Sequence, residues 1–204
     1  MKQAMKFSTS SFLYIMTLVL FVSQAHSQKV KQEYEKDIKE EEVPAKILEL
    51  IKPMLEESRR IKYYEEYDGE KTGYEIKMLW RDRQLSVEFY ADGRLMDIEE
   101  LISFREMEEE AREEIAEYFK EEFEKYKIQR LQRQYTPEEE EEEDEELLED
   151  FMEDDREDLT IRYEIVARVK GNEMYGEYEF LFDDEGELID VQKIERRSLD
   201  NVLY

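Results

Sequence analysis

Apolar and polar residues alternate in several short segments of the chain. Segment 73–80 carries apolar residues at every second position, namely Tyr74, Ile76, Met78 and Trp80. The same period of two recurs in segments 85–90, 161–169 and 178–182. A period of two predicts antiparallel strands that bury one face and leave the other wet. Trp80 lies in the inward-facing set and is expected in the core.

Four strands are predicted in the first half, at about residues 61–67, 73–80, 85–90 and 95–98. Asp92-Gly93 and Glu185-Gly186 each precede a short apolar segment and predict a tight turn between two strands.

Two segments show helical spacing instead. The first runs from Pro44, a favoured first helical residue, and Pro53 should kink or end it early. Its apolar positions are Ile47, Leu48, Ile51 and Leu55. The second follows Ser103, which forms a capping-box pattern with Glu106. Its predicted buried stripe is Ala111, Ile115, Phe119, Phe123 and Tyr126.

Parts of the chain repeat. Tyr74-Glu75-Ile76 recurs as Tyr163-Glu164-Ile165, and segment 89–98 matches 182–191 with Phe, Gly, Leu and Asp at equal offsets. We therefore predict an α+β fold of two tandem repeats, each a helix packed on a four-stranded antiparallel sheet. The expected boundaries are a charged linker at 28–42, a first repeat at 43–102 and a second at 103–204.

An acidic insertion at 136–158 interrupts the second repeat. It contains an unbroken acidic run from Glu138 to Glu146, and like charges of this kind repel one another. Leu147, Leu148, Phe151 and Met152 then fall on one side of a short helix. Either this patch docks on the protein's own sheet, which we favour, or Leu148 and Phe151 enter a basic-rimmed groove of a partner.

The N-terminus has the three parts of a secretory signal peptide. Lys2 and Lys6 precede an apolar run from Phe12 to Val22, and Ala25-His26-Ser27 supplies small residues for cleavage after Ser27. The apolar run is too short for a membrane span, which needs about 20 residues. We expect a periplasmic or secreted protein without a membrane anchor after cleavage.

Charge narrows the range of partners. The chain has 30 basic and 57 acidic residues and a formal charge of -27. Removal of residues 1–27 takes away Lys2, Lys6 and His26, which leaves 30 − 2 = 28 basic residues and a charge of 28 − 57 = -29. Such a chain repels nucleic acid and anionic lipid, and it attracts basic or mixed-charge protein surfaces.

The residue types also limit the chemistry. The chain has no Cys, and its one His lies in the predicted signal peptide, so common nucleophiles, general bases and transition-metal ligands are missing. Asp183-Asp184-Glu185-Gly186 is too short for a calcium loop. We predict no enzyme, no cofactor and no specific metal site, and at most weak binding of divalent cations. A carboxylate-dependent hydrolase needs two acids in a cleft, and no cleft is expected.

The sheet face without helices is the candidate binding surface. Together with the insertion, the predicted partner-binding residues are Tyr64, Leu79, Tyr90, Arg162, Val166, Arg168, Leu148 and Phe151. Two alternatives stay open, because this face could pack against the other repeat or be an ordinary wet surface.

Short motifs in both repeats resemble a known family. Val43-Pro44-Ala45, Tyr74-Glu75-Ile76 and segments 89–95 and 182–188 are similar to PepSY-like, beta-lactamase-inhibitor-protein-like (BLIP-like) periplasmic domains. The resemblance implies a helix on a four-stranded antiparallel sheet, often in tandem, with binding or inhibition as its role. The missing cysteines and the acidic insertion depart from the pattern, so no inhibitory residue is carried over.

Together, these observations predict an exported, non-enzymatic protein-binding module, such as an inhibitor or modulator of an envelope protein. The alternative is an acidic cation-binding protein that buffers calcium, or a structural envelope protein.

Overall fold

The structure is a computed structural model that describes residues 29–31, 33–68, 71–137, 144–155, 159–171 and 173–194. The predicted signal peptide and its cleavage site lie outside these residues. Within the described part, no helix has the length and apolarity needed to cross a membrane.

Ten strands form one continuous sheet in the order β1-β10-β9-β8-β7-β6-β5-β4-β3-β2. β1 pairs with β10 in parallel, and every other neighbouring pair is antiparallel. The strands are β1 (Lys29–Lys31), β2 (Glu33–Ile38), β3 (Ser58–Asp68), β4 (Lys71–Trp80), β5 (Arg83–Tyr90), β6 (Leu95–Leu101), β7 (Lys125–Pro137), β8 (Leu159–Gly171), β9 (Met174–Phe182) and β10 (Leu188–Ile194).

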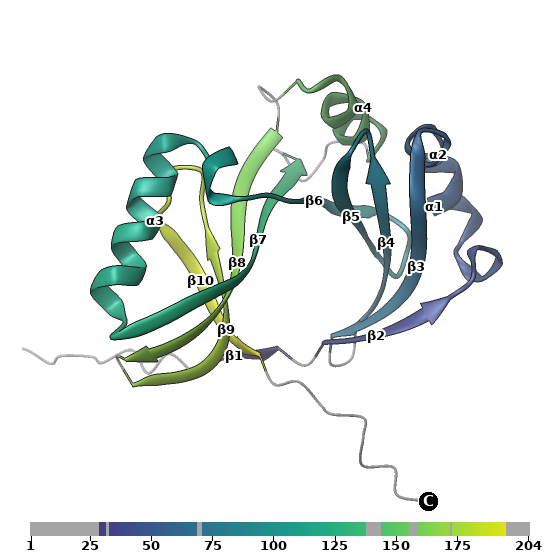
Figure 1. Ribbon diagram of the computed structural model, residues 1–204. Helices are drawn as coiled ribbons and strands as arrows, with labels where there is room; N and C mark the ends of the chain where they lie inside the picture. The colour runs from purple at the N-terminus through teal and green to yellow at the C-terminus, as the bar shows by residue number, and fades with distance from the viewer. Residues whose placement is uncertain are drawn as a thin grey trace, which may run out of the picture.

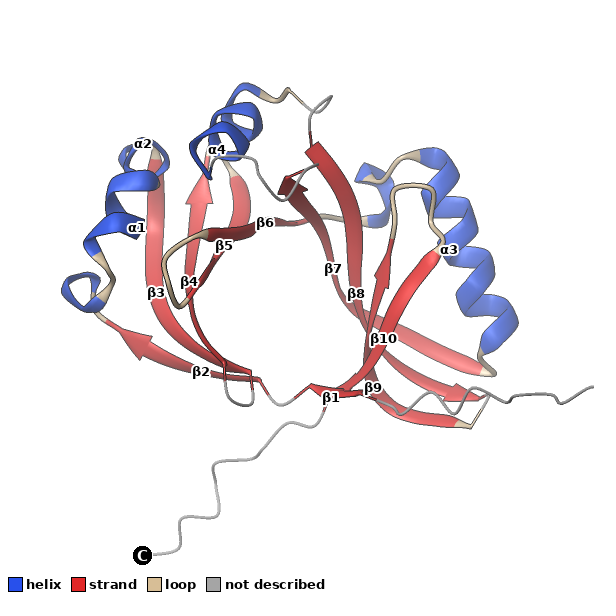
Figure 2. Ribbon diagram, turned by 180° about the vertical axis from the view of Figure 1, so that it is seen from behind, coloured by secondary structure: helices blue, strands red, loops and turns tan. Residues whose placement is uncertain are grey.

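The sheet is strongly curved, and all the α-helices lie on its convex side (Figures 1 and 2). Its edge strands β1 and β2 are separated by one residue, so the two ends of the sheet approach each other. The helical segments are η1 (Glu40–Glu42), α1 (Ala45–Leu50), α2 (Lys52–Glu56), η2 (Phe104–Glu106), α3 (Glu109–Glu122) and α4 (Asp144–Glu153).

One hydrophobic core lies between β3–β6 and the helices α1, α2 and α4. Ile47, Ile51 and Met54 of the first helical segment are fully buried there. The predicted interruption is present, because α1 ends before Ile51 and Pro53 occupies the first turn of α2. Trp80 is 1% exposed, as expected for a core residue.

A second core lies between α3 and β7–β10. Ala111, Ile115 and Phe119 are fully buried along α3, and Phe119 meets Phe180 at 4.9 Å between ring centroids. Tyr126 was predicted to continue this stripe, but it lies in β7 and is 43% exposed. The helix ends at Glu122, before the stripe does.

The predicted fold of two tandem repeats, each with its own four-stranded sheet, is wrong. β6 and β7 pair through Ile98↔Tyr135 to Leu101↔Gln132 and join all the strands into a single sheet. Alternation of side chains predicts where strands lie, but it does not say which strand edges pair. The central strands would otherwise expose unpaired backbone groups, and pairing satisfies them.

The region predicted as a charged linker, 28–42, contains two strands. β2 pairs with β3 from Glu33↔Asp68 to Ile38↔Tyr63, and β1 pairs with β10. These short, highly charged strands cover the ends of the sheet, which is a common way to protect edges.

Candidate functional site

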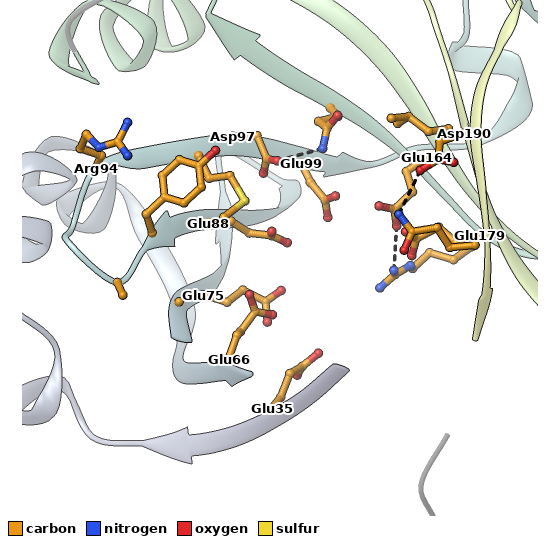
Figure 3. A pocket seen from close by; sticks show the side chains of 18 of the residues that line it. Glu35, Glu66, Glu75, Glu88, Arg94, Asp97, Glu99, Glu164, Glu179 and Asp190 are labelled. Carbon is orange, nitrogen blue, oxygen red and sulfur yellow. Dashed lines mark hydrogen bonds and ion pairs between the residues drawn. The ribbon is translucent and has the colours of Figure 1, made fainter. Parts of the chain in front are cut away.

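The concave side of the sheet forms a groove of about 790 Å³. Side chains from β2 to β10 line it, so residues far apart in the sequence face one another (Figure 3). Its acidic lining residues are Glu35, Glu66, Glu75, Glu88, Asp92, Asp97, Glu99, Glu164, Glu179 and Asp190. We call this surface the acidic groove.

The acidic groove follows from the alternation of each strand. Ile76 and Val87 point to the convex core, and their neighbours Glu75 and Glu88 therefore point to the concave side. Curvature of the sheet then brings these inward-facing carboxylates together. Several are nearly buried, with exposed fractions of 4% for Glu75, Asp97 and Glu99.

Glu35, Glu66 and Glu75 form one group, with carboxylate oxygens within 4.8 Å of one another. Burial, followed by the charges of Glu75 and Glu35, raises the pKa of Glu66 to about 8. Ser86 donates a hydrogen bond to Glu75. Lys77 Nζ lies 2.9 Å from Glu75 Oε2 and 3.1 Å from Glu35 Oε2, so one cation of the chain partly neutralises this group.

Glu88, Asp97 and Glu99 form the second group, again within 4.8 Å. Burial, and then the charges of Asp97 and Glu99, raises the pKa of Glu88 well above its usual value. Gln134 Nε2 donates to Asp97 Oδ2 at 2.8 Å, and Gln132 donates to Glu99. These amides are neutral donors, so they hold the carboxylates in place without balancing their charge.

The positive charge in the lining is small. Among the described residues, the lining cations are Arg94 and Arg130. Arg94 Nε lies 3.0 Å from Asp92, and Arg130 lies 2.8 Å from Glu164 Oε1. The two arginines therefore already have carboxylate partners, while ten acids line the same space.

This arrangement suits a cationic ligand. Charged groups in a low-dielectric, like-charged cluster are destabilised, and an added cation relieves both the repulsion and the lost hydration. Hydrogen bonds from an ammonium or guanidinium to carboxylates are short and strong. The presence of this groove of about 790 Å³ also shows that the expectation of no cleft was wrong.

Six of the eight predicted partner-binding residues lie on the concave face by the strand register, namely Tyr64, Leu79, Tyr90, Arg162, Val166 and Arg168. Tyr90 lines the acidic groove and is 38% exposed. Tyr64 pairs with Glu75 of the groove, and Lys77 Nζ lies 4.9 Å from the centre of the Tyr64 ring. Leu79 and Arg162 are partly buried, Val166 is 4% exposed and Arg168 is exposed.

Leu148 and Phe151 lie on the opposite, convex side. Both are buried, and the ring of Phe151 meets Trp80 at 5.6 Å and Tyr135 at 4.9 Å between centroids. α4 therefore packs on its own sheet, which is the interpretation that the sequence favoured, and these two residues are not offered to a partner.

Sequence reasoning selected the aromatic and basic residues of the concave face and passed over most of its acids. Alternation along β5 and β9 puts Glu88, Glu179 and Leu181 on that face, and all three line the groove. The same alternation would also have given Asp97 and Glu99. Glu35 could not have been found this way, because β2 was taken for a linker.

Comparisons with known proteins give a likeness of fold. No protein-family model matches the chain, and no curated protein matches it. Among solved structures, it is similar to a DUF2874 family protein from Bacteroides ovatus, at 10% identity over 73% of this chain and 86% of the other, with a TM-score of 0.48.

Two further structures have TM-scores of 0.46. A BLIP-like protein from Bacteroides fragilis is 11% identical over 78% of this chain and 90% of its own. A protein from Bacteroides eggerthii described as "putative periplasmic" is 13% identical over 74% and 88%. The resemblance to BLIP-like proteins is thus borne out as a likeness, and no site, ligand or partner is carried over from it.

Proposed function

We propose that this protein is an exported binding module whose acidic groove holds a cationic segment of a partner protein. The observation that supports the proposal is the gathering of ten carboxylates around about 790 Å³ of space, with two lining arginines that are already paired.

A segment with Lys or Arg side chains fits this groove better than a lone metal ion. Tyr90, Met96 and Leu181 lie among the acids and can pack against the methylene stems of long basic side chains. The groove is also of the size that ligand-binding clefts usually have, on the order of 300–1,000 Å³. Its two carboxylate groups are neighbours, because Glu75 of the first pairs with Glu88 of the second, so one basic segment can meet both.

Export is part of the proposal and rests on the predicted signal peptide of residues 1–27. In the periplasm or outside the cell, the mature chain with its charge of about -29 would draw basic surfaces toward it, and more strongly at low salt.

The test is a titration with a fluorescent oligolysine peptide at low and at high salt. Asp97→Asn combined with Glu99→Gln should weaken binding about tenfold, since two groove carboxylates held by neutral amides are lost. The control is Glu113→Gln combined with Glu117→Gln on the exposed face of α3, which removes the same net charge. We expect the control to weaken binding by less than about twofold.

Equal losses in the two double variants would show that the peptide follows net charge and not the groove, and the proposal would be abandoned. Calorimetry with calcium serves as a second measurement. Tight binding at a fixed stoichiometry would favour the cation-buffering alternative over a peptide partner.

A carboxylate-dependent hydrolase is a second candidate. It is favoured by the raised pKa of Glu88 beside Asp97 and Glu99, whose oxygens lie within 4.8 Å. Carboxyl groups on the order of 5 Å apart suit glycoside hydrolysis with retention of configuration. This candidate would be supported if the protein hydrolyses aryl glycosides, Glu88→Gln loses the activity and Glu113→Gln keeps it. If neither the wild type nor any variant hydrolyses them, the hydrolase is rejected and the binding module stands.

A further inference from the structure

A second, smaller hollow lies beyond the acidic groove, across β7, β8 and β9. It encloses about 460 Å³, and its charged lining residues are Lys125, Lys127, Arg168, Lys170 and Glu177. One carboxylate thus stands among four cations, in a chain that has 57 acidic and 30 basic residues. We call this surface the cationic trough.

The register places these side chains in two parallel rows. Lys125 pairs with Lys170, which pairs with Tyr175, and Lys127 pairs with Arg168, which pairs with Glu177. The row between them points to the other side of the sheet, where Val169 is 2% exposed in the core. The two rows therefore share the concave face with Glu164, which lies four residues before Arg168 and lines the acidic groove.

This arrangement works against stability of the free protein. Like charges directly opposite each other on neighbouring strands are destabilising, and the trough has two such pairs, Lys125–Lys170 and Lys127–Arg168. The acids nearby balance part of the charge, since Glu177 lies 3.7 Å from Arg168 and Glu124 lies 3.1 Å from Lys170. The side chains of Arg168 and Lys170 stay 70% and 56% exposed, so both are accessible to an anionic group.

We infer that the partner is a bipolar protein segment, whose basic part occupies the acidic groove and whose acidic part lies on Lys127 and Arg168 in the cationic trough. The inference rests on the proposed function of the groove and specifies its partner. Four residues of a strand span about 13 Å, so the two parts of an extended partner are separated by about four residues.

A protein segment fits this surface better than a membrane does. An anionic bilayer on this face would also meet the ten carboxylates of the acidic groove, which repel it. Tyr175, at the end of the trough, is 78% exposed, and Tyr and Arg are the residues that most often dominate protein interfaces.

The test compares two synthetic peptides. Both have a short lysine block and a glycine-serine spacer of about four residues, and they end in either glutamates or glutamines. We expect the glutamate peptide to bind the full chain about tenfold more tightly, because its acidic end adds charge pairs with the trough.

Lys127→Gln combined with Arg168→Gln should reduce that advantage to less than about twofold, without changing the affinity for the glutamine peptide. The control is Lys52→Gln on α2, whose side chain is 70% exposed and distant in sequence from the trough. It should leave the advantage intact.

The outcomes separate the two proposals. If the glutamine peptide binds as tightly as the glutamate peptide, the bipolar inference fails and the acidic groove stands. If neither peptide binds, the proposed function fails. If vesicles of anionic lipid bind the wild type and not the trough variant, the trough serves a membrane surface, and the inference is overturned.

Discussion

Lys77 Nζ lies 2.9 Å from Oε2 of Glu75 at one end of the acidic groove. Burial alone would lower the pKa of Lys77, but the charges and hydrogen bonds of Glu75 and Glu35 outweigh it, and the pKa stands above its usual value. The pair shows within the protein how the groove holds an ammonium group. A basic side chain from a partner would meet the same kind of contacts at Asp97 and Glu99.

Removal of this internal cation should change both stability and binding. We expect Lys77→Gln to lower the free energy of unfolding by about 1–2 kcal/mol at pH 7, because the buried Glu75 loses its counter-charge. The expected loss is smaller than for a fully buried pair, since the Lys77 side chain is 35% exposed. Oligolysine should bind this variant more tightly than the wild type.

Urea unfolding and the peptide titration check these effects. Lys52→Gln, at an exposed position, is the matched control and should change neither quantity measurably. Unchanged stability of Lys77→Gln would mean that this ion pair does not hold the groove together.

The groove should also make stability fall as pH rises. The pKa of Glu66 is about 8 in the folded protein against an ordinary 4.5. Between those values the folded state binds more protons than the unfolded state, so the free energy of unfolding decreases with increasing pH. Glu88 acts in the same direction.

Thermal unfolding at a series of pH values between about 5 and 9 measures this slope. Glu66→Gln should flatten it and raise Tm at the alkaline end by about 2–4 °C, which corresponds to roughly 1 kcal/mol for a chain of this size. Glu113→Gln, on the exposed face of α3, should keep the wild-type slope. A wild-type Tm that rises with pH over this range would contradict the account.

A partly buried ion pair at the junction of the two cores should have the opposite pH dependence. Arg83 donates two hydrogen bonds to Glu100, at 2.8 and 2.7 Å, and Arg133 lies 3.8 Å from the same carboxylate. Burial would raise the pKa of Glu100, but the hydrogen bonds and charge of Arg83 outweigh it and hold the pKa below its usual value. This stabilisation is present above pH 4.5 and disappears as pH falls through the lower, folded pKa.

Glu100→Gln should therefore cost about 2–3 kcal/mol at neutral pH, because it leaves Arg83 without its partner in a mostly buried position. The difference from the wild type should shrink in acid. Equilibrium unfolding of both proteins at neutral and at acid pH measures it, and a difference that does not depend on pH would refute the role given to this pair.

The packing of α4 can be tested at Phe151. The side chain is 2% exposed and contacts Trp80 and Tyr135, so Phe151→Ala should destabilise the protein by about 3 kcal/mol or more. Met152, next to it and partly exposed, gives the control Met152→Ala, with an expected loss of less than about 1.5 kcal/mol. Equal, small effects would show that α4 does not depend on this contact.

The sequence predicted local structure far better than assembly. Alternation placed β4 and β5 within a few residues, and Pro53 marked the break between α1 and α2. The glycine turns were also correct, since Gly93 and Gly186 have positive φ values and close tight turns. These features depend on near neighbours in the chain, which a sequence displays directly.

The acidic groove depends on relations that the sequence does not display. Whether Glu88 meets Asp97 is decided by the pairing of β5 with β6, while its distance from Glu164 depends on the β6–β7 pairing and on curvature. The short charged segment of β2 lacks an apolar period, so its place beside β3 is set by the free edge of the sheet. The sequence shows which residues of each strand place a charge on the solvent-facing side. It does not show that these side chains converge on one groove.

The most direct test of the groove uses methyl NMR of methionine-labelled protein with oligolysine. Met96 lines the acidic groove, Met152 lies on the acidic helix α4, and Met107 is 4% exposed in the second core. We predict that the Met96 signal shifts in proportion to bound peptide, while the signals of Met152 and Met107 stay in place. A shift of Met152 with Met96 unchanged would locate the peptide on the acidic insertion and contradict the proposed function of the groove.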